Sequence, residues 1–325
     1  MKKWIKNTSN LTLHNSRTFT ASSVQTSTSV DPWFIAGFAD GESSFSFSII
    51  KSDNYKVGWY IRPVFQIELG GRDIALLESI RSYMGVGNIA ITQRGTVKYS
   101  VRNLNDLTSV IIPFFDTYNL ITKKQADFQI FKEIINLMNN KEHLSEEGLK
   151  KILSLRASLN WGLSPGLLES FPSITPVSRP EVKAQEIPDP NWLAGFTSAE
   201  GCFRCRIYKS TSKIGESVEL ELSVTQHSRD IALIKSLDAY LGCGTTLELA
   251  TNSAVRFYVK KFSYIYNIII PFYKKYPIQG TKSLDFNDFC KVAELVNNKA
   301  HLTTVGLDKI RQIKDGMNSK RNAHS

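Results

Sequence analysis

The sequence predicts an α+β protein made of two similar halves, each a four-stranded antiparallel sheet with helices on one face. Three observations support this fold class: a phrase that occurs twice, further matches at a nearly constant spacing, and strand-like alternation after each phrase. The phrase reads WFIAGFADGESSFSF from Trp33 and NWLAGFTSAEGCFRC from Asn191. Two copies related by an internal two-fold axis would form a fused version of a symmetric dimer.

The duplication continues well beyond that phrase. Three further pairs of segments match: GGRDIALLESIRSYMGVGNI from Gly70 with HSRDIALIKSLDAYLGCGTT from His227, IIPFFDTYNLITKKQADF from Ile111 with IIPFYKKYPIQGTKSLDF from Ile269, and NNKEHLSEEGLKKI from Asn139 with NNKAHLTTVGLDKI from Asn297. We therefore expect two domains, residues 31–159 and 190–318, and a short tail over 319–325.

Each half is expected to contain the same elements in the same order. A short apolar helix comes first, over residues 32–41 and 190–199, and two alternating strands follow it. A helix with apolar residues at helical spacing comes next, then two more strands and closing helices. The order α-β-β-α-β-β-α predicts helices on one face of each sheet.

Two further segments lie outside the repeats. Residues 160–189 are rich in proline, which fixes φ and removes a donor, so we expect an extended tether with one helical turn. Residues 1–30 are basic, free of acidic residues and rich in Ser and Thr. A mitochondrial targeting segment and a plain disordered leader share that composition, and both interpretations stay open.

The bulk composition favours a polyanionic partner. The net charge is +10, which points to nucleic acid first and to an anionic membrane surface second. No run of about 18 apolar residues occurs, so the sequence predicts no membrane span. Cys202 and Cys205 have CxxC spacing, but they fall in a strand without a second pair, so we interpret them as reduced intracellular cysteines.

The first helix of each half is dense in small residues and is followed by a glutamate. Small side chains let two helices approach closely, so these helices are the expected seam, and Glu42 and Glu200, just past their ends, would converge. Two carboxylates beside partially negative helix ends repel each other. A divalent metal site would require such a pair, whereas the alternative is two surface glutamates that start two strands.

At these residues the chain resembles a known family. IAGFADGES from Ile35 and LAGFTSAEG from Leu193 are similar to the two motifs of single-chain LAGLIDADG homing endonucleases, of the mitochondrial group I intron-encoded type. The resemblance implies two domains packed at a two-helix seam to form a DNA-binding saddle. It also implies a monomer that cleaves double-stranded DNA and leaves 3′ overhangs. Two positions depart from the motif: Ser43 replaces its usual glycine, and Ser198 its usual acidic residue.

The resemblance also assigns a metal centre and catalytic residues. Two or three Mg²⁺ ions at the domain interface would be bound by the carboxylates of Glu42 and Glu200 and the carbonyls of Gly41 and Ala199. Gln226 matches a supporting glutamine of the family, but its counterpart in the first half is Leu69, so the two sites should be unequal. The remaining catalytic candidates are two equivalent lysines, Lys124 and Lys282.

Strand alternation together with the resemblance predicts the face that reads DNA. The outward residues are Ser44, Ser46, Ser48, Ile50, Gln66 and Glu68 in the first half, and Cys202, Arg204, Arg206, Tyr208, Ser223 and Thr225 in the second. Lys98, Arg102, Arg256 and Lys260 on the later strands would extend the contact. Arg204 and Arg206 have no acidic neighbour along their strand and should read guanine edges. The serine-rich first half should read fewer bases directly.

Two other functions remain open at this point. The same scaffold could bind intron RNA as a splicing maturase, or it could bind DNA without cleaving it. Retention of both Glu42 and Glu200 argues against a non-cleaving binder, because such a protein has no use for two repelling carboxylates. A mitochondrial location is expected for the endonuclease.

Overall fold

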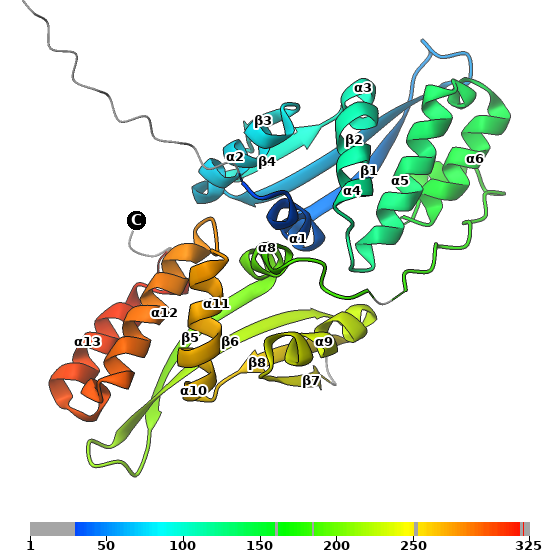
Figure 1. The fold of residues 1–325 in the computed structure, drawn as a ribbon. Coiled ribbons are helices and arrows are strands. Elements are labelled where there is room, and N and C mark those ends of the chain that lie inside the picture. Colours follow the sequence, from blue (N-terminus) through cyan, green and yellow to red (C-terminus); the bar gives the residue numbers. More distant parts are fainter. Residues whose placement is uncertain (1–29, 160–161, 184, 250–252, 319–320, 322–325) are drawn as a thin grey trace, which may run out of the picture.

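The computed structural model describes residues 30–159, 162–183, 185–249, 253–318 and 321, and it has the predicted two-domain α+β architecture. Figure 1 shows the two domains side by side, with α1 (Pro32–Glu42) and α8 (Pro190–Glu200) adjacent at the centre. The predicted leader lies outside the described residues except for Val30. That residue is buried in the core, so the fold starts at least one residue earlier than predicted.

Each domain contains one four-stranded antiparallel sheet, with strand order β1-β2-β4-β3 in the first and β5-β6-β8-β7 in the second. The strands of the first sheet are β1 (Ser43–Lys51), β2 (Trp59–Gly70), β3 (Asn88–Ile91) and β4 (Thr96–Val101). Those of the second are β5 (Gly201–Lys209), β6 (Glu216–His227), β7 (Thr245–Leu249) and β8 (Ala254–Val259). Arg102 and Lys260, predicted on the later strands, lie just beyond the ends of β4 and β8.

The helices cover one face of each sheet, as predicted (Figure 1). In the first domain they are α2 (Ile74–Met84), α3 (Leu104–Asp106), α4 (Ile112–Thr117), α5 (Lys124–Asn139) and α6 (Glu146–Ala157). In the second they are α9 (Ile231–Leu241), α10 (Phe262–Tyr264), α11 (Ile270–Lys275), α12 (Lys282–Asn297) and α13 (Thr304–Asp315). Short 3₁₀ segments are η1 (Gly71–Asp73), η3 (Glu142–Leu144), η4 (Ser228–Asp230) and η6 (Ala300–Leu302), and π-helical turns are η2 (Leu107–Ile111) and η5 (Ile265–Ile269).

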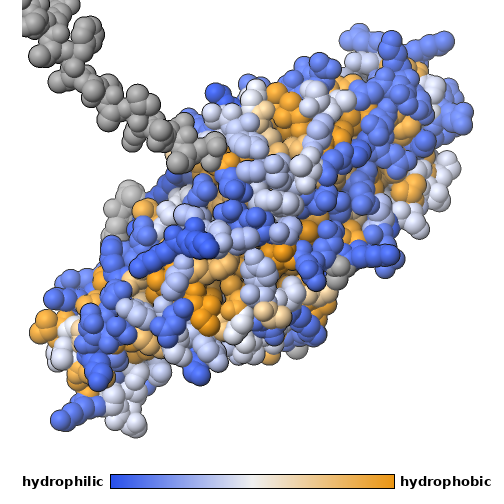
Figure 2. Space-filling view, viewed as in Figure 1, coloured by the Kyte–Doolittle hydropathy of each residue, from blue (hydrophilic) through white to orange (hydrophobic). Residues whose placement is uncertain are grey.

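Aromatic side chains fill the space between sheet and helices. Phe45 on β1 packs against Phe65, Phe115 and Phe131, with ring centroids 5.2–5.5 Å apart. Phe203 takes the same position in the second domain. Both phenylalanines are almost fully buried. The strand alternation read from the sequence therefore places the correct faces inward. Most of the molecular face in Figure 2 is hydrophilic, with hydrophobic residues in patches.

The segment between the domains is more closely attached than a free tether. It contains the expected helical turn, α7 (Pro165–Ser170). Beyond α7, the Arg179 guanidinium lies 2.8 Å from Asp127 at the start of α5. Val182 is buried, and its carbonyl accepts a hydrogen bond from Lys123 Nζ at 2.7 Å. The connector thus follows the surface of the first domain before it enters α8.

Among the described residues, no helix is both long enough and apolar enough to cross a membrane.

Candidate active site

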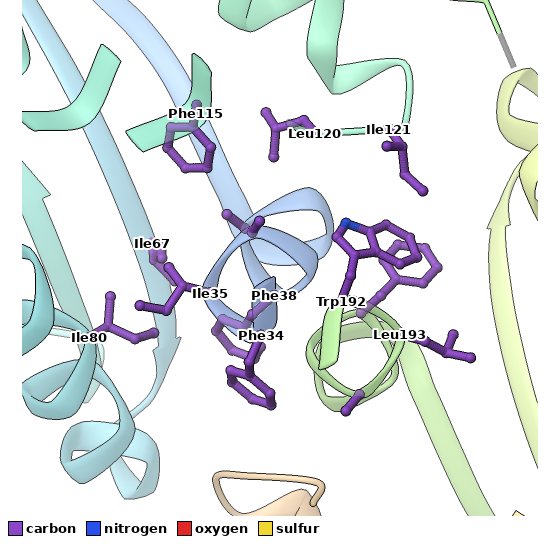
Figure 3. Close-up of a cluster of buried hydrophobic side chains, with 14 of the residues drawn as sticks. Phe34, Ile35, Phe38, Ile67, Ile80, Phe115, Leu120, Ile121, Trp192 and Leu193 are labelled. Carbon is purple, nitrogen blue, oxygen red and sulfur yellow. The ribbon is translucent and has the colours of Figure 1, made fainter. Parts of the chain in front are cut away.

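The seam between the domains is formed by α1 and α8, and each helix starts at an Asp-Pro pair. Asp31 accepts the backbone N–H of Trp33 at 2.8 Å, and Asp189 accepts that of Asn191 at 2.7 Å. An aspartate N-cap followed by proline at the first helical position is a strong start signal. Figure 3 shows the two helices side by side, with Phe38 and Trp192 among the buried side chains around them.

Two glycines allow the backbones of these helices to meet. A Cβ atom at Gly37 would overlap the carbonyl oxygen of Trp192, and a Cβ at the equivalent Gly195 would overlap that of Phe34. The density of small residues noted in the sequence thus has a direct structural reason.

The close approach brings the two helix ends together with their glutamates. Glu42 and Glu200 are the last helical residues of α1 and α8, rather than lying just past the ends as predicted. A Cβ at Gly41 would lie 3.4 Å from Glu200 Oε1, so this carboxylate lies beside the end of the other helix. Glu42 and Ala199 line one cavity of about 630 Å³. Each carboxylate therefore lies near a main-chain position of the opposite domain.

Two lysines bind main-chain carbonyls at these helix ends. Lys124 Nζ donates to the carbonyls of Ala39 and Gly41, both at 2.9 Å. Lys282 Nζ donates to the carbonyl of Ala199 at 2.7 Å. The last carbonyls of a helix have no partner within it and carry partial negative charge, so a cation is stabilised there. The two lysines, which occupy equivalent positions in the repeat, thus also occupy equivalent positions in space.

The electrostatics of the cluster follow from its burial. Burial raises the pKa of Glu42, and the nearby charge of Glu200 raises it further. Burial also raises the pKa of Glu200, while Lys124 and Lys282 act in the opposite direction. For the lysines, burial lowers the pKa of Lys124 to about 8 and also lowers that of Lys282. Two carboxylates of raised pKa at one helix junction are an arrangement that an added cation would stabilise.

The two sites differ in one supporting side chain. Gln226 Nε2 donates to Glu200 Oε1 at 3.0 Å. At the equivalent position beside Glu42 the chain has Leu69, which lines the same cavity and offers no donor. The surroundings of Glu200 and Glu42 therefore differ at this position of the repeat.

The donor atoms fit a hard divalent cation. Carboxylate oxygens and main-chain carbonyls at helix ends are the ligands that calcium and magnesium prefer. Within the described part of the chain, no group of three or more His, Cys, Asp or Glu side chains could hold a metal ion. An ion here would therefore complete its coordination with carbonyls, water and oxygens of a bound substrate.

Comparison with known proteins decides the family. The model of the family described as LAGLIDADG endonuclease matches residues 35–135 and 193–293. The chain belongs to the LAGLIDADG endonuclease family. A solved structure of the I-SmaMI LAGLIDADG homing endonuclease bound to cleaved DNA is 43% identical, with a TM-score of 0.88 over 90% of this chain and 98% of that one.

A second structure of the same relative and one curated protein add detail. I-SmaMI bound to an uncleaved DNA target in the presence of calcium ions is 43% identical, with a TM-score of 0.87 over 89% of this chain and 99% of that one. The Neurospora crassa protein named "Probable intron-encoded endonuclease 2" is 41% identical over 89% of this chain. This chain spans 65% of the length of that curated relative.

The LAGLIDADG motif of the first half contains a buried aspartate that binds residues of both domains. The carboxylate of Asp40 is 2% exposed and accepts hydrogen bonds from Ile121 N, Thr122 N, Thr122 Oγ1 and Trp192 Nε1, at 2.6–3.2 Å. Burial raises its pKa to about 6. In the second motif the hydroxyl of Ser198 accepts the N–H of Gln279 at 3.1 Å and donates to the carbonyl of Ala194 at 2.8 Å, so the departure at this position leaves the hydroxyl paired.

The other departure, Ser43, causes no disruption of the turn from α1 into β1. Its backbone is extended, and its hydroxyl donates to the carbonyl of Ala39 at 2.7 Å.

The predicted DNA-reading face lies on the outer side of both LAGLIDADG sheets. On the first sheet, Ser48 and Ile50 are exposed and Ser44, Ser46 and Gln66 are partly exposed. Glu68 is paired with Lys98 at 2.9 Å. On the second sheet, Arg204, Arg206, Tyr208 and Thr225 are exposed and Cys202 is partly exposed, whereas Ser223 is only 4% exposed. Ser223 is covered because its small side chain lies between Cys202 on β5 and Tyr258 on β8.

Arg204 and Arg206 have no acidic neighbour along their own strand, as predicted, but they have acidic partners on the next strand. The register of β5 and β6 sets Glu221 opposite Arg204 and Glu219 opposite Arg206. Glu221 is 1% exposed and also pairs with Arg256 and Lys260. Adjacency along one strand could not show these partners, because they come from the next strand.

Sequence reasoning also missed two aspartates of the domain interface, Asp73 and Asp230. Asp73 Oδ1 accepts Thr281 N at 2.6 Å, and Asp230 Oδ1 accepts Lys123 N at 2.7 Å. The only sequence signal for them is the Arg-Asp pair repeated in both halves.

Proposed function

We propose that this protein is a site-specific homing endonuclease that hydrolyses both strands of a long DNA target in a reaction that depends on a divalent cation. One observation carries the proposal. The paired helix ends hold Glu42 and Glu200 close together, with a partly buried lysine and a main-chain carbonyl beside each helix end. Membership of the LAGLIDADG family and the DNA-bound relatives support it.

The chain's own residues would assemble two metal sites across the seam. Glu42 with the carbonyl of Ala199, and Glu200 with the carbonyl of Gly41, are the proposed ligands, with Mg²⁺ as the proposed ion. When bound, such an ion polarises a scissile phosphate and stabilises charge on the leaving oxygen. Since the carboxylates repel each other and are partly buried, binding of an ion is favoured here over an empty pair.

Lysines and the glutamine would support this chemistry. Lys124 and Lys282 hold the carbonyl ends in place before substrate binds, and their ammonium groups lie where phosphate charge would accumulate. Gln226 orients the Glu200 carboxylate through its hydrogen bond. Because Leu69 cannot do the same for Glu42, the two strands should be cut at different rates.

Recognition of the target would use the outer faces of the sheets. Arg204 and Arg206 are about half exposed and can donate two hydrogen bonds each to guanine in the major groove. The first sheet presents serines there and should read fewer bases directly. A net charge of +10 supports binding to the phosphate backbone.

We further propose a monomer that acts in the mitochondrion. The internal repeat supplies two active sites in one chain, so no second copy is required. The relatives named as intron-encoded endonucleases support an organelle origin. The alternative of intron RNA binding rests on the resemblance alone.

Conservative changes of the two glutamates test the proposed function. The substrate is DNA spanning the uninterrupted insertion site of the intron that encodes the protein, incubated with magnesium for cleavage and with calcium for binding. Glu42→Gln and Glu200→Gln should each abolish double-strand cleavage, because each removes a carboxylate ligand. DNA affinity in calcium should change little, since groove contacts lie elsewhere.

The matched control is Glu78→Gln, the same change at an exposed position of α2. This variant should cut at the parent rate. Ordinary double-strand cleavage by either site variant would show that these carboxylates are not the metal ligands.

A further inference from the structure

Two equivalent aspartates cross the domain boundary in opposite directions. Asp73, at the end of η1, accepts the backbone N–H of Thr281 at 2.6 Å. Asp230, at the end of η4, accepts the backbone N–H of Lys123 at 2.7 Å. Each aspartate belongs to one domain, and each N–H belongs to the other. The pair therefore forms a reciprocal clasp between the domains.

The clasped residues immediately precede the active-site lysines. Thr281 and Lys123 are the N-cap residues of α12 and α5, which begin at Lys282 and Lys124. Neither N-cap residue uses its own side chain to accept a helical N–H. A carboxylate is favoured at this end of a helix by the free N–H groups and the helix dipole. The carboxylate that fills this place comes from the other domain in both cases.

The same aspartates lie beside the glutamates of their own domain. Glu42, Asp73, Thr281 and Lys282 line one cavity, to which the first domain supplies the two acids and the second the other two residues. On the other side, burial raises the pKa of Glu200, the charge of Lys124 from the first domain lowers it and the charge of Asp230 raises it, so both groups lie near this carboxylate. Each active site is thus built from both domains.

The loop before α12 has little freedom to reach Asp73 in another way. Gly280 has φ +68°, a left-handed conformation that favours glycine. A Cβ atom at this position would lie 2.5 Å from Asp73 Oδ1, which is closer than a side-chain carbon can approach. The backbone of this loop therefore packs directly against the carboxylate of Asp73.

We infer that Asp73 and Asp230 are positioning residues that assemble each active site across the domain boundary, Asp73 by setting Lys282 beside Glu42 and Asp230 by setting Lys124 beside Glu200. The inference rests on the proposed function of the two glutamates. Neither aspartate is a metal ligand in it, and each acts through the lysine of the other domain.

Strand-resolved cleavage tests this inference. The two strands of the target carry different labels, so the cleavage of each strand is measured separately. Glu42→Gln and Glu200→Gln show which strand depends on which glutamate. Asp73→Ala should slow, by about tenfold, cleavage of the strand that Glu42→Gln no longer cuts. Asp230→Ala should slow cleavage of the other strand. Each variant loses one hydrogen bond that orients a lysine. Asp73→Asn and Asp230→Asn keep the Oδ1 acceptor and should restore the rate.

A second readout does not depend on cleavage. Amide hydrogen exchange of the full chain without metal should become faster around Thr281 in Asp73→Ala and around Lys123 in Asp230→Ala, with the opposite loop unchanged. Ile80→Val, a buried change in the neighbouring helix α2, controls for a general loss of stability and should slow both strands equally or neither.

Two results would overturn the inference, and they differ from a failure of the proposed function. One is equal slowing of the cleavage of both strands by each alanine variant. The other is amide protection of both loops at the level of the parent chain. Either would mean that the aspartates are general interface contacts. Normal cleavage by Glu42→Gln and Glu200→Gln would instead reject the site itself.

Discussion

Single residues give the two halves of the proposed active site different surroundings. Gln226 donates a hydrogen bond to Glu200, while Leu69 fills the equivalent place beside Glu42. A carboxylate that lacks this partner is free to rotate away from the geometry that binds an ion. The difference lies at one position of the repeat. A single substitution can therefore remove the glutamine from the second half or add one to the first half.

Exchange of these two residues should change strand preference. Gln226→Leu should slow cleavage of the strand cut at Glu200 by about tenfold, through loss of one hydrogen bond to the carboxylate. Leu69→Gln should bring the rates of the two strands closer. Labelled-strand cleavage measures both, and Gln312→Leu, at an exposed position of α13, is the matched control. Equal rates for the two strands in the parent protein would contradict this interpretation.

The arginines of β5 should contribute to base readout. Arg204→Ala or Arg206→Ala should each weaken specific binding by about 1–3 kcal/mol and relax base preference on the side of the target bound by the second domain. Cleavage of a library with every single-base substitution measures this preference. A uniform loss at all positions, with a shallower salt dependence, would instead indicate contact with phosphate only.

Glu221 should affect the same part of the target without touching DNA. Its nearly buried carboxylate faces Arg204, Arg256 and Lys260, and it fixes the directions of these three cations. Glu221→Gln removes the carboxylate that Arg204 and Arg256 share and leaves Lys260 with Glu219 alone, so the three cations should adopt several conformations. We expect Glu221→Gln to relax base preference at the same target positions as Arg204→Ala. Unchanged preference at those positions, measured with the same library, would show that the arginine is oriented by DNA alone.

At the level of secondary-structure elements, the α1–α8 seam depends on two glycines. Gly195→Ala should lower the free energy of unfolding by about 1–3 kcal/mol, because the added methyl group overlaps the carbonyl of Phe34 and the helices must separate. Urea denaturation measures the change. Gly166→Ala on α7, where a Cβ would meet nothing within 4 Å, is the control and should not destabilise. An undiminished stability of Gly195→Ala would mean that the helices are not held at this distance.

At the level of the whole molecule, the domains should remain together without their covalent connection. The seam buries Phe34, Phe38 and Trp192 and is supplemented by the two aspartate clasps. A protease site inserted after the exposed Ser173 allows the chain to be cut within the connector. We expect the cut protein to elute as one particle at micromolar concentration and to retain cleavage.

The connector should matter on dilution. An intact short connection holds its two partners at an effective concentration of about millimolar, and the cut chain loses this advantage. Activity of the cut protein should therefore fall with dilution while that of the uncut protein does not. Separation into two species at micromolar concentration would show that the seam is weaker than its burial indicates.

The sequence by itself determined the features that depend on local pattern. Two-residue alternation placed Phe45 and Phe203 inward, and the duplicated motif identified Glu42 and Glu200 as an equivalent pair. These features could be predicted because periodicity and repetition are properties of short stretches of chain. Even there the prediction was limited: Ser223 faces the expected side, but larger neighbours on adjacent strands cover it.

Only the tertiary structure decided which residues of distant segments meet. Strand register set Glu221 opposite Arg204, and the docking of the domains set Asp73 on the N–H of Thr281 and Asp230 on that of Lys123. Register and docking are fixed by the packing of whole faces against one another, so a one-residue slip would change every pair at once. No short stretch of sequence carries that information, which is why Glu42, Glu200 and Gln226 could be predicted while Asp73, Asp230 and Glu221 could not.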